Sequence, residues 1–261
     1  MHDLPLYLLV FLIMAAFAAG FVDSIAGGGG LITIPALLIV GFPPVAALGT
    51  NKLQGLFGSG SATLSYARAG HVNLKSQWLP ALLAALGSGV GAYVAASVPG
   101  EYFRVALPLL LIAIALYFAF KPNMNDLDRT SRMTPLVFTL TFVPFIGAYD
   151  GIFGPGAGSF YMLGFVSLAG YGVLKATAHT KLLNFSSNVA GFAVFAAAGV
   201  IAWKIGLIMG VAQFIGAQVG SRLAMKKGAG LIKPLLVITC AALAIRLLSE
   251  PDNPVRVWLG F

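Results

Sequence analysis

Apolar stretches separated by short polar or Pro/Gly-rich turns occupy most of this chain of 261 residues. A helix of roughly 20 apolar residues can cross the hydrocarbon core of a bilayer. The pattern therefore predicts an all-α polytopic membrane protein with about five membrane segments in each half. The predicted segments are residues 5–26, 30–41, 45–67, 77–98 and 102–120, followed by 134–153, 157–170, 173–199, 204–225 and 231–249.

The composition excludes a soluble globular domain. Hydrophobic residues make up 59% of the chain and charged residues only 9%, whereas charged residues are about 25% of a typical soluble domain. The net charge of +8 lies mostly on short loops between apolar stretches, where it serves membrane topology rather than nucleic-acid binding. We therefore expect the lipid bilayer as a partner and no nucleic acid.

An internal repeat divides the chain. Residues 20–35 read GFVDSIAGGGGLITIP and residues 147–158 read GAYDGIFGPGAG, so an aspartate followed by clustered glycines recurs 127 positions later. Farther along, Lys52 recurs as Lys181 at an offset of 129 positions. The repeat predicts two transmembrane halves joined by a cytoplasmic linker. In chain order, these three units are residues 1–120, 121–135 and 136–261.

The glycine clusters predict breaks in two helices at the middle of the membrane. Each glycine costs about 1 kcal/mol relative to alanine in a helix, and an interrupted helix exposes backbone groups that hydrocarbon cannot satisfy. Such a break is tolerated where protein or a wet cavity surrounds it, and the N-terminus of the helix that restarts there attracts anions. Interrupted segments at matching places in two halves point to the binding site of a transporter.

Loop charges predict the orientation. If each half contributes an odd number of segments, one membrane face carries ten cations and the other carries four. Cationic loops favour the cytoplasm, so we expect both termini in the periplasm and the two halves inverted relative to each other. The second segment of each half is short, and either a re-entrant hairpin or a tilted pair of helices fits it. The ten cations are Arg68, Lys75, Lys121, Arg129, Arg132, Lys175, Arg222, Lys226, Lys227 and Lys233; the four are Arg104, Lys204, Arg246 and Arg256.

The ionisable residues within the predicted spans are Asp23, Lys52, Asp150, His179 and Lys181. A charge at the centre of a bilayer is costly unless it is paired or lies in a wet cavity. Two compatible interpretations follow. In one, the aspartates neutralise the lysines or cap the broken helices. In the other, the lysines bind an anionic substrate while an aspartate or His179 exchanges protons.

Polar residues and glycines near these charges complete a predicted site for a small oxyanion. Hydroxyl and amide groups can donate hydrogen bonds to its oxygen atoms, although they also join membrane helices. We expect no metal and no cofactor. The residues predicted to bind the substrate are Lys52, Lys181, Thr50, Asn51, Thr180, Gly28, Gly29, Gly156 and Asn184. The residues predicted to couple protons are Asp23, Asp150 and His179.

Two pairs of glycines recur at a spacing of four residues, Gly87 with Gly91 and Gly216 with Gly220. Small residues at this spacing let membrane helices approach closely. We therefore interpret these glycines as helix contacts rather than substrate contacts.

Five stretches carry a resemblance to a known family: SIAGGGGLITIPALL, ALGTNKLQG, YDGIFGPGAGSFY, KATAHTKLLNFSSN and GAQVGSRLAMKKGAGLIKP. Through them nearly the whole chain resembles the TauE/SafE family of sulfite and sulfonate exporter-like proteins, especially its bacterial inner-membrane members. The resemblance implies a permease of two related halves that moves sulfite, thiosulfate, organosulfonates or similar anions, coupled to the proton gradient. It extends to the glycine breaks, Lys52 and Lys181. Many relatives with an assigned sulfur substrate differ at Lys52, so the exact anion and the direction stay open.

Other function classes fit less well. Paired intramembrane aspartates also occur in intramembrane aspartyl proteases, but the Pro-Ala-Leu at residue 35 precedes the Tyr-Asp at residue 149 here, the reverse of the order in those enzymes. We therefore expect no enzymatic activity. A passive anion channel or a structural subunit of a membrane complex is the alternative to a carrier. The sequence leaves the oligomeric state open and allows a homodimer.

Overall fold

The computed structural model describes residues 4–99, 102, 128 and 130–227. Within these residues the chain is all-helical and has no β-strand. The predicted segment 231–249 and most of segment 102–120 and of the linker 121–135 lie outside them. The helices are α1 (Leu6–Ala26), α2 (Gly30–Ile39), α3 (Pro44–Arg68), α4 (Trp78–Ser97), α6 (Pro135–Val137), the π-helix η1 (Phe138–Phe142), α7 (Val143–Ile152), α8 (Ala157–Ser167), α9 (Val173–Ala197) and α10 (Trp203–Lys227).

Four of the described helices are long and apolar enough to cross a bilayer: α1, α4, the continuous α6–η1–α7 helix and α10. Helices α2 and α8 are apolar but have only 10 and 11 residues, so neither crosses roughly 30 Å of hydrocarbon alone. Helices α3 and α9 have 25 residues each and bury many polar side chains. Such side chains suit helices that other helices shield from lipid.

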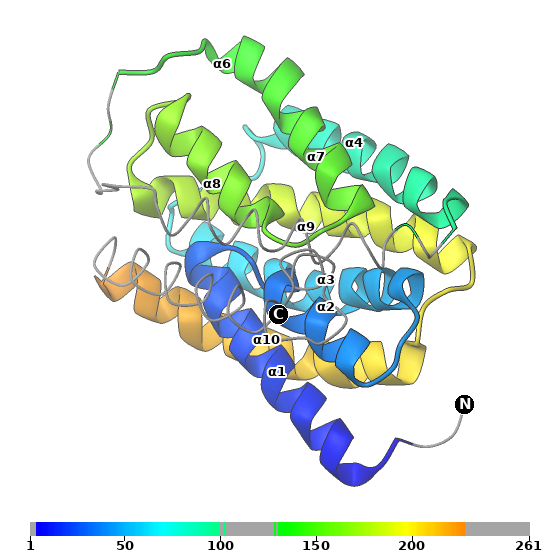
Figure 1. Cartoon of the computed structure of the whole chain (residues 1–261). Helices are drawn as coiled ribbons and strands as arrows, with labels where there is room; N and C mark the ends of the chain where they lie inside the picture. Colours follow the sequence, from blue (N-terminus) through cyan, green and yellow to red (C-terminus); the bar gives the residue numbers. More distant parts are fainter. Residues whose placement is uncertain (1–3, 100–101, 103–127, 129, 228–261) are drawn as a thin grey trace, which may run out of the picture.

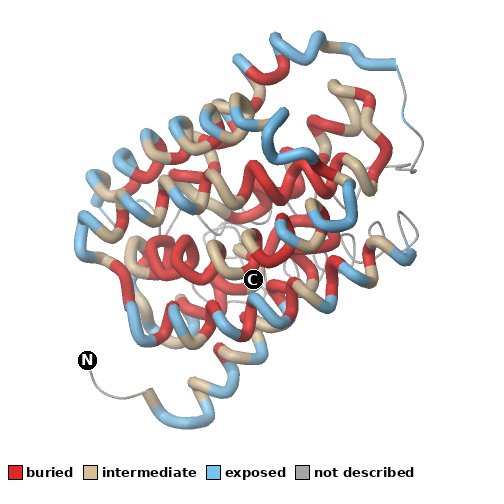
Figure 2. The backbone as a smooth tube through the Cα atoms, turned by 180° about the vertical axis from the view of Figure 1, so that it is seen from behind, coloured by how far each residue is buried: buried red, intermediate tan, exposed pale blue. Residues whose placement is uncertain are grey.

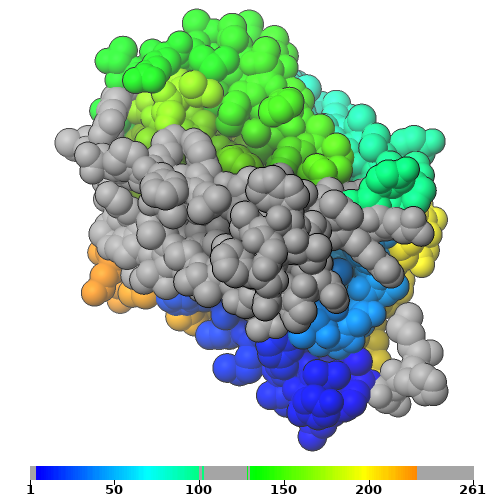
Figure 3. Space-filling view, in the orientation of Figure 1, coloured from blue at the N-terminus to red at the C-terminus, as the bar shows by residue number. Residues whose placement is uncertain are grey.

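Helices α3 and α9 pack against each other in the middle of the molecule (Figure 1). Helix α1 packs against α10 on one side, and α4 packs against α7 on the other. In Figure 2, buried residues gather along the central helices and exposed residues along the outer ones. The space-filling view places α1 and the α6–α7 helix at opposite edges of one face (Figure 3). Each outer pair therefore joins a helix from before the linker to one from after it.

The paired glycines explain how closely the outer helices approach. A methyl group at Gly91 would come within 3.0 Å of a carbonyl oxygen of α7, and one at Gly220 would come equally close to a carbonyl oxygen of α1. Gly87 and Gly216 meet the backbone of the same two partner helices. The interpretation of these four glycines as helix contacts is confirmed.

Both predicted glycine clusters lie where one helix ends and the next begins. A short non-helical turn separates α1 from α2, and another separates α7 from α8. In the first turn, φ is 78° at Gly27 and 99° at Gly28; in the second, it is 84° at Gly154 and 75° at Gly156. Residues with a Cβ atom rarely adopt these angles, so glycine permits the chain to turn here.

Asp128, in the middle of the linker, contacts the start of α9. One carboxylate oxygen accepts a hydrogen bond from the backbone N–H of Gly172 at 2.6 Å, and the other lies 2.8 Å from Lys175 Nζ. Lys175 also lies 4.1 Å from the centre of the Tyr171 ring. The hydrogen bond from Lys175, and then that from Gly172, lowers the pKa of the Asp128 carboxyl.

This contact predicts a pH-dependent contribution to stability. Because the pKa of folded Asp128 is lowered, the stabilisation is fully present above the ordinary carboxyl pKa of about 3.9 and is lost as the pH falls through the folded value. Both side chains are about half exposed, so Asp128→Asn should destabilise the protein by about 0.2–1 kcal/mol at pH 7. Thermal unfolding in detergent from pH 7 to pH 3 measures this difference.

Lys175→Met provides the control for this prediction. Lys175→Met removes the ammonium group that Asp128 contacts. The Asp128→Asn/Lys175→Met double variant should therefore be at least as stable as the less stable of the two single variants. An Asp128→Asn variant as stable as the unmodified protein at pH 7 would contradict the prediction.

Candidate functional site

Two buried ion pairs connect the two halves of the chain. Lys52 Nζ on α3 lies 2.7 Å from Asp150 Oδ1 on α7, and Lys181 Nζ on α9 lies 3.2 Å from Asp23 Oδ2 on α1. The lysine side chains are only 2% and 0% exposed. Each lysine therefore pairs with the aspartate of the other half, which confirms that the aspartates neutralise the lysines and leaves the four groups with no net charge.

Different groups hold the two helix breaks. In the first break, Asp23 Oδ1 accepts a hydrogen bond from the backbone N–H of Gly29 at 3.1 Å. In the second, the hydroxyl group of Tyr149 donates a hydrogen bond to the carbonyl oxygen of Pro155. Asp23 therefore caps the start of α2 as well as pairing with Lys181.

A small polar cavity lies between the two breaks. It offers about 30 Å³ to the centres of water molecules, which is room for about two waters. The polar side chains around it are Asp23, Asn51, Asp150, Asn184, Asn188 and Gln213. The remaining lining residues are small, namely Gly28, Gly29, Gly30, Gly55, Gly154, Ala157 and Gly158.

Amide nitrogens are the hydrogen-bond donors at this cavity. The side-chain oxygen of Asn51 accepts hydrogen bonds from Thr33 at 2.7 Å and from Gln54 at 3.3 Å, and this fixes the amide. Its nitrogen then lies between the breaks, 3.5 Å from the position of a Cβ atom at Gly30 or at Gly154. Among the described residues, no hydrogen bond occupies this nitrogen, so a ligand with oxygen acceptors could use it.

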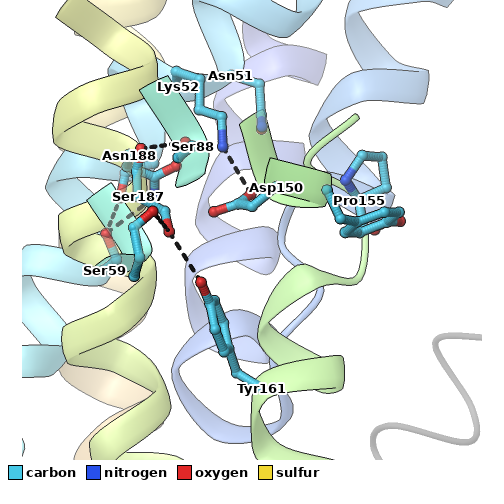
Figure 4. Close-up of polar contacts among 12 residues, drawn as sticks. Asn51, Lys52, Ser59, Ser88, Asp150, Pro155, Tyr161, Ser187 and Asn188 are labelled. Carbon is cyan, nitrogen blue, oxygen red and sulfur yellow. Dashed lines mark hydrogen bonds and ion pairs between the residues drawn. The ribbon is translucent and has the colours of Figure 1, made fainter. Parts of the chain in front are cut away.

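Hydrogen bonds between α3, α4 and α9 extend from the cavity (Figure 4). Asn188 Nδ2 donates to Ser59 Oγ at 3.2 Å, and these two residues occupy equivalent positions of the repeat, 129 apart. Ser88 donates to the carbonyl oxygen of Ser187 at 2.7 Å. In Figure 4 the hydroxyl group of Tyr161 points toward Ser187, at 3.4 Å. Polar contacts therefore join the middle of α9 to α3 and to α4.

The structure brings most of the predicted site residues together, but not all. Asp23, Asp150, Asn51, Asn184, Gly28 and Gly29 line the cavity. Lys52 and Lys181 lie behind the aspartates and contact the cavity only through them.

The other predicted residues lie away from the cavity lining. Thr50 accepts a hydrogen bond from the backbone N–H of Ala202 at 3.1 Å. The buried hydroxyl group of Thr180 has no hydrogen bond within the described part of the chain. Gly156 supplies the left-handed turn before α8.

His179 belongs to an aromatic cluster. Its Nδ1 atom lies 2.8 Å from the carbonyl oxygen of Lys175, and its ring packs against Phe165 and Tyr171 with centroid distances of 5.6 and 5.0 Å. The site geometry therefore places the aspartates, rather than His179, beside the space open to a ligand.

Sequence reasoning missed Gln213 and Gly55 as cavity residues. Gln213 is 3% exposed on α10, and a buried amide within an apolar helix was the available signal. Gly55 is the equivalent of Asn184 at the offset of 129. A methyl group at Gly55 would lie 2.9 Å from Asn188 Nδ2, so its absence makes space for that amide.

The observed cavity is too small for an oxyanion with several heavy atoms. Its 30 Å³ holds about two waters, and the aspartate oxygens occupy the positions next to both ammonium groups. In the structure, carboxylates therefore fill the places where an anion would meet the lysines.

Comparison with known proteins identifies the family. A family model described as sulfite exporter TauE/SafE matches residues 12–247. The chain is 68% identical to a probable membrane transporter protein, ORF9, of Sinorhizobium sp., over 100% of both chains. It is 46% identical to the probable membrane transporter protein YfcA of Escherichia coli K12, over 97% of this chain and 94% of the relative.

A probable membrane transporter protein of Haemophilus influenzae is 45% identical over 95% of this chain and 97% of its own length. No solved structure shows a significant match. With its apolar helices, its buried charges and these relatives, the chain belongs to the TauE/SafE family and is a multi-pass membrane transporter.

Proposed function

We propose that the protein exports small oxyanions such as sulfite, thiosulfate or organosulfonates across the bacterial inner membrane, together with protons. The observation that carries this proposal is the pair of buried ion pairs, Lys52–Asp150 and Lys181–Asp23, beside one polar cavity. The description of the matching family as a sulfite exporter supports the class of substrate. Export is the work of a carrier, not of an enzyme, and it uses no metal and no cofactor.

Competition for the lysines couples the anion to the proton. A carboxylate and an oxyanion are both negative oxygen acceptors, so they compete for the same ammonium group. Protonating an aspartate removes its negative charge and frees its lysine, so the anion and the proton bind together. A divalent anion with one proton carries one net negative charge. An inside-negative membrane potential favours its outward movement by about 2.3 kcal/mol per 100 mV.

Two inverted halves provide the carrier architecture of this proposal. The packing of α1 on α10 corresponds under the repeat to the packing of α7 on α4, as expected for halves related by a twofold axis in the membrane plane. The helix breaks would then lie near the bilayer centre. In this arrangement both termini are periplasmic, and residues 1–120 and 136–261 form the halves on either side of a cytoplasmic linker.

Transport in liposomes tests the proposal. With an acidic external solution, purified protein should accumulate labelled sulfite at least tenfold above liposomes without protein, because protons entering with the anion supply the driving force. An inside-positive potential should also increase uptake. A thermal-shift screen of sulfite, thiosulfate and small sulfonates would identify the preferred anion, since a ligand of the native state raises the unfolding temperature.

A passive channel would behave differently in the same experiment. Its flux would not saturate with sulfite concentration, and a pH gradient at zero potential would not drive accumulation. Such a result, or the absence of anion movement under every gradient, would refute the proposed carrier.

A further inference from the structure

The two helix breaks occupy corresponding places in the repeat but differ in how they are held. Asp23 accepts the backbone N–H of Gly29 through Oδ1 and contacts Lys181 through Oδ2, so both of its oxygens are in use. Asp150 contacts Lys52 through Oδ1. Among the described residues, no hydrogen bond joins Asp150 to the turn between α7 and α8.

The difference originates in the neighbouring residue. Tyr149 precedes Asp150 and holds the second break through its hydroxyl group, which bonds the carbonyl oxygen of Pro155. At the corresponding place before Asp23, 127 positions earlier, the chain has Val22. Valine has no hydrogen-bond donor in its side chain, so in the first half the aspartate itself holds the break.

We propose that Asp150 is the carboxylate that exchanges the transported proton, whereas Asp23 serves as a structural cap. Tyr149 is a positioning residue, because it holds the second break and leaves Asp150 free to titrate. This assignment rests on the proposed function and specifies which half of the site performs the coupling.

The cost of protonation differs between the two aspartates. Protonating Asp23 weakens a charge-assisted hydrogen bond to the backbone of the break as well as its ion pair. Protonating Asp150 weakens its contact with Lys52 and its hydrogen bond with the side chain of Ser187, but neither partner belongs to the backbone of the break. An incoming anion replaces the contact with Lys52. Protonation of Asp23 therefore loosens the turn that lines the cavity, whereas protonation of Asp150 leaves the local backbone unaltered.

The surroundings of Asp150 fit this role. The charged and titratable groups near it are Lys52 from α3, Asp23 from α1 across the cavity, Tyr161 from α8 and the adjacent Tyr149. The side chain of Ser187 on α9 also hydrogen-bonds it. Lys181 from α9 is occupied by Asp23. The contacts described for α4 add the uncharged Ser88, which bonds the backbone of α9. Lys52 is therefore the ammonium group that a protonated Asp150 releases.

Two transport assays on reconstituted protein test the assignment. Uptake of labelled sulfite driven by a pH gradient requires a coupled proton, whereas exchange of labelled for unlabelled sulfite at equal pH does not. Asp150→Asn mimics the protonated residue, so uptake should fall to the level without a gradient. Exchange should remain measurable but lose its pH dependence, because the amide of asparagine does not titrate.

Variants of Asp23 provide the matched comparison. Asp23→Asn keeps a side-chain oxygen that accepts from Gly29 but leaves Lys181 unpaired, so its uptake and exchange should be slower and should keep the pH dependence of the unmodified protein. Asp23→Ala lacks this acceptor and should lose both uptake and exchange. Tyr149→Phe should slow exchange without shifting its pH profile, since it loosens the break but leaves the titrating carboxyl in place.

Infrared titration of the purified protein tests directly whether Asp150 takes up the proton. It needs neither a transport assay nor a stable variant of Asp23. Acidification should produce the carbonyl band of a buried carboxylic acid in the unmodified protein but not in Asp150→Asn. Persistence of this band in Asp150→Asn, or gradient-driven uptake by that variant, would overturn the assignment. If the unmodified protein moves no anion, the proposed function fails, while the infrared band still shows whether Asp150 titrates.

Discussion

Replacing Lys52 by methionine is expected to abolish gradient-driven sulfite uptake and to destabilise the folded protein by about 3–5 kcal/mol. The methionine has a similar length but no charge, so Asp150 is left buried without its partner. Removing one member of a buried ion pair typically carries a cost of this size. Lys52 is only 2% exposed, so water cannot replace it. Uptake in liposomes and thermal unfolding in detergent measure the two effects.

A double variant separates the effect on transport from that on stability. Lys52→Met/Asp150→Leu replaces the whole pair with apolar groups, which is often neutral for stability. It should therefore unfold near the temperature of the unmodified protein and still transport nothing. Lys75→Met, in an exposed loop, is the control for the same chemical change. Uptake by both Lys52→Met and Lys181→Met would remove the lysines from the mechanism.

Replacing Gly91 by alanine is expected to destabilise the protein by about 3 kcal/mol, the upper end of the cost of overpacking. The added methyl group would meet the carbonyl oxygen of Ala148 and the backbone nitrogen of Ile152 on α7. Backbone atoms cannot rotate away as a side chain does, so α4 and α7 must separate. The unfolding temperature in detergent and the yield of folded protein in membranes measure the effect.

Gly89 on the same helix is the matched control. A methyl group at Gly89 would lie 3.8 Å from the nearest atom, the Cβ of Ala190, which is an ordinary packing distance. Gly89→Ala should therefore be neutral or stabilising by up to about 1 kcal/mol, as for a glycine replaced within a helix. Equal stability of Gly89→Ala and Gly91→Ala would contradict the close contact between α4 and α7.

Local features of the chain were predictable from sequence. The apolar window 77–98 appears as α4 (Trp78–Ser97), and the window 173–199 appears as α9 (Val173–Ala197). The positions of helix ends were predictable from proline, glycine and polar residues, because these residues affect the conformation of their immediate neighbours. The π-helical turn at Phe138–Phe142 was not predicted, because apolar periodicity does not distinguish it from an α-helix.

Partners across the fold were harder to predict. The sequence indicated that Asp23 and Asp150 neutralise lysines, and both pairs exist, but the spacing along the chain does not say which lysine each aspartate meets. The pairing crosses the halves because α1 and α7 each pack beside helices of the other half. The same long-range packing brings Gln213 on α10 to the cavity, so its amide within an apolar helix could be noticed in the sequence, but its place at the cavity could not be predicted.

The pairing of α1 with α10 constrains how the chain is made. Helix α1 packs against a helix whose synthesis begins about 180 residues after α1 ends, which takes about ten seconds or more at bacterial rates of elongation. Asp23 likewise lacks its partner Lys181 until α9 has been made. Assembly of this transporter is therefore completed after translation rather than half by half, and separately expressed halves should fold only when they are produced together.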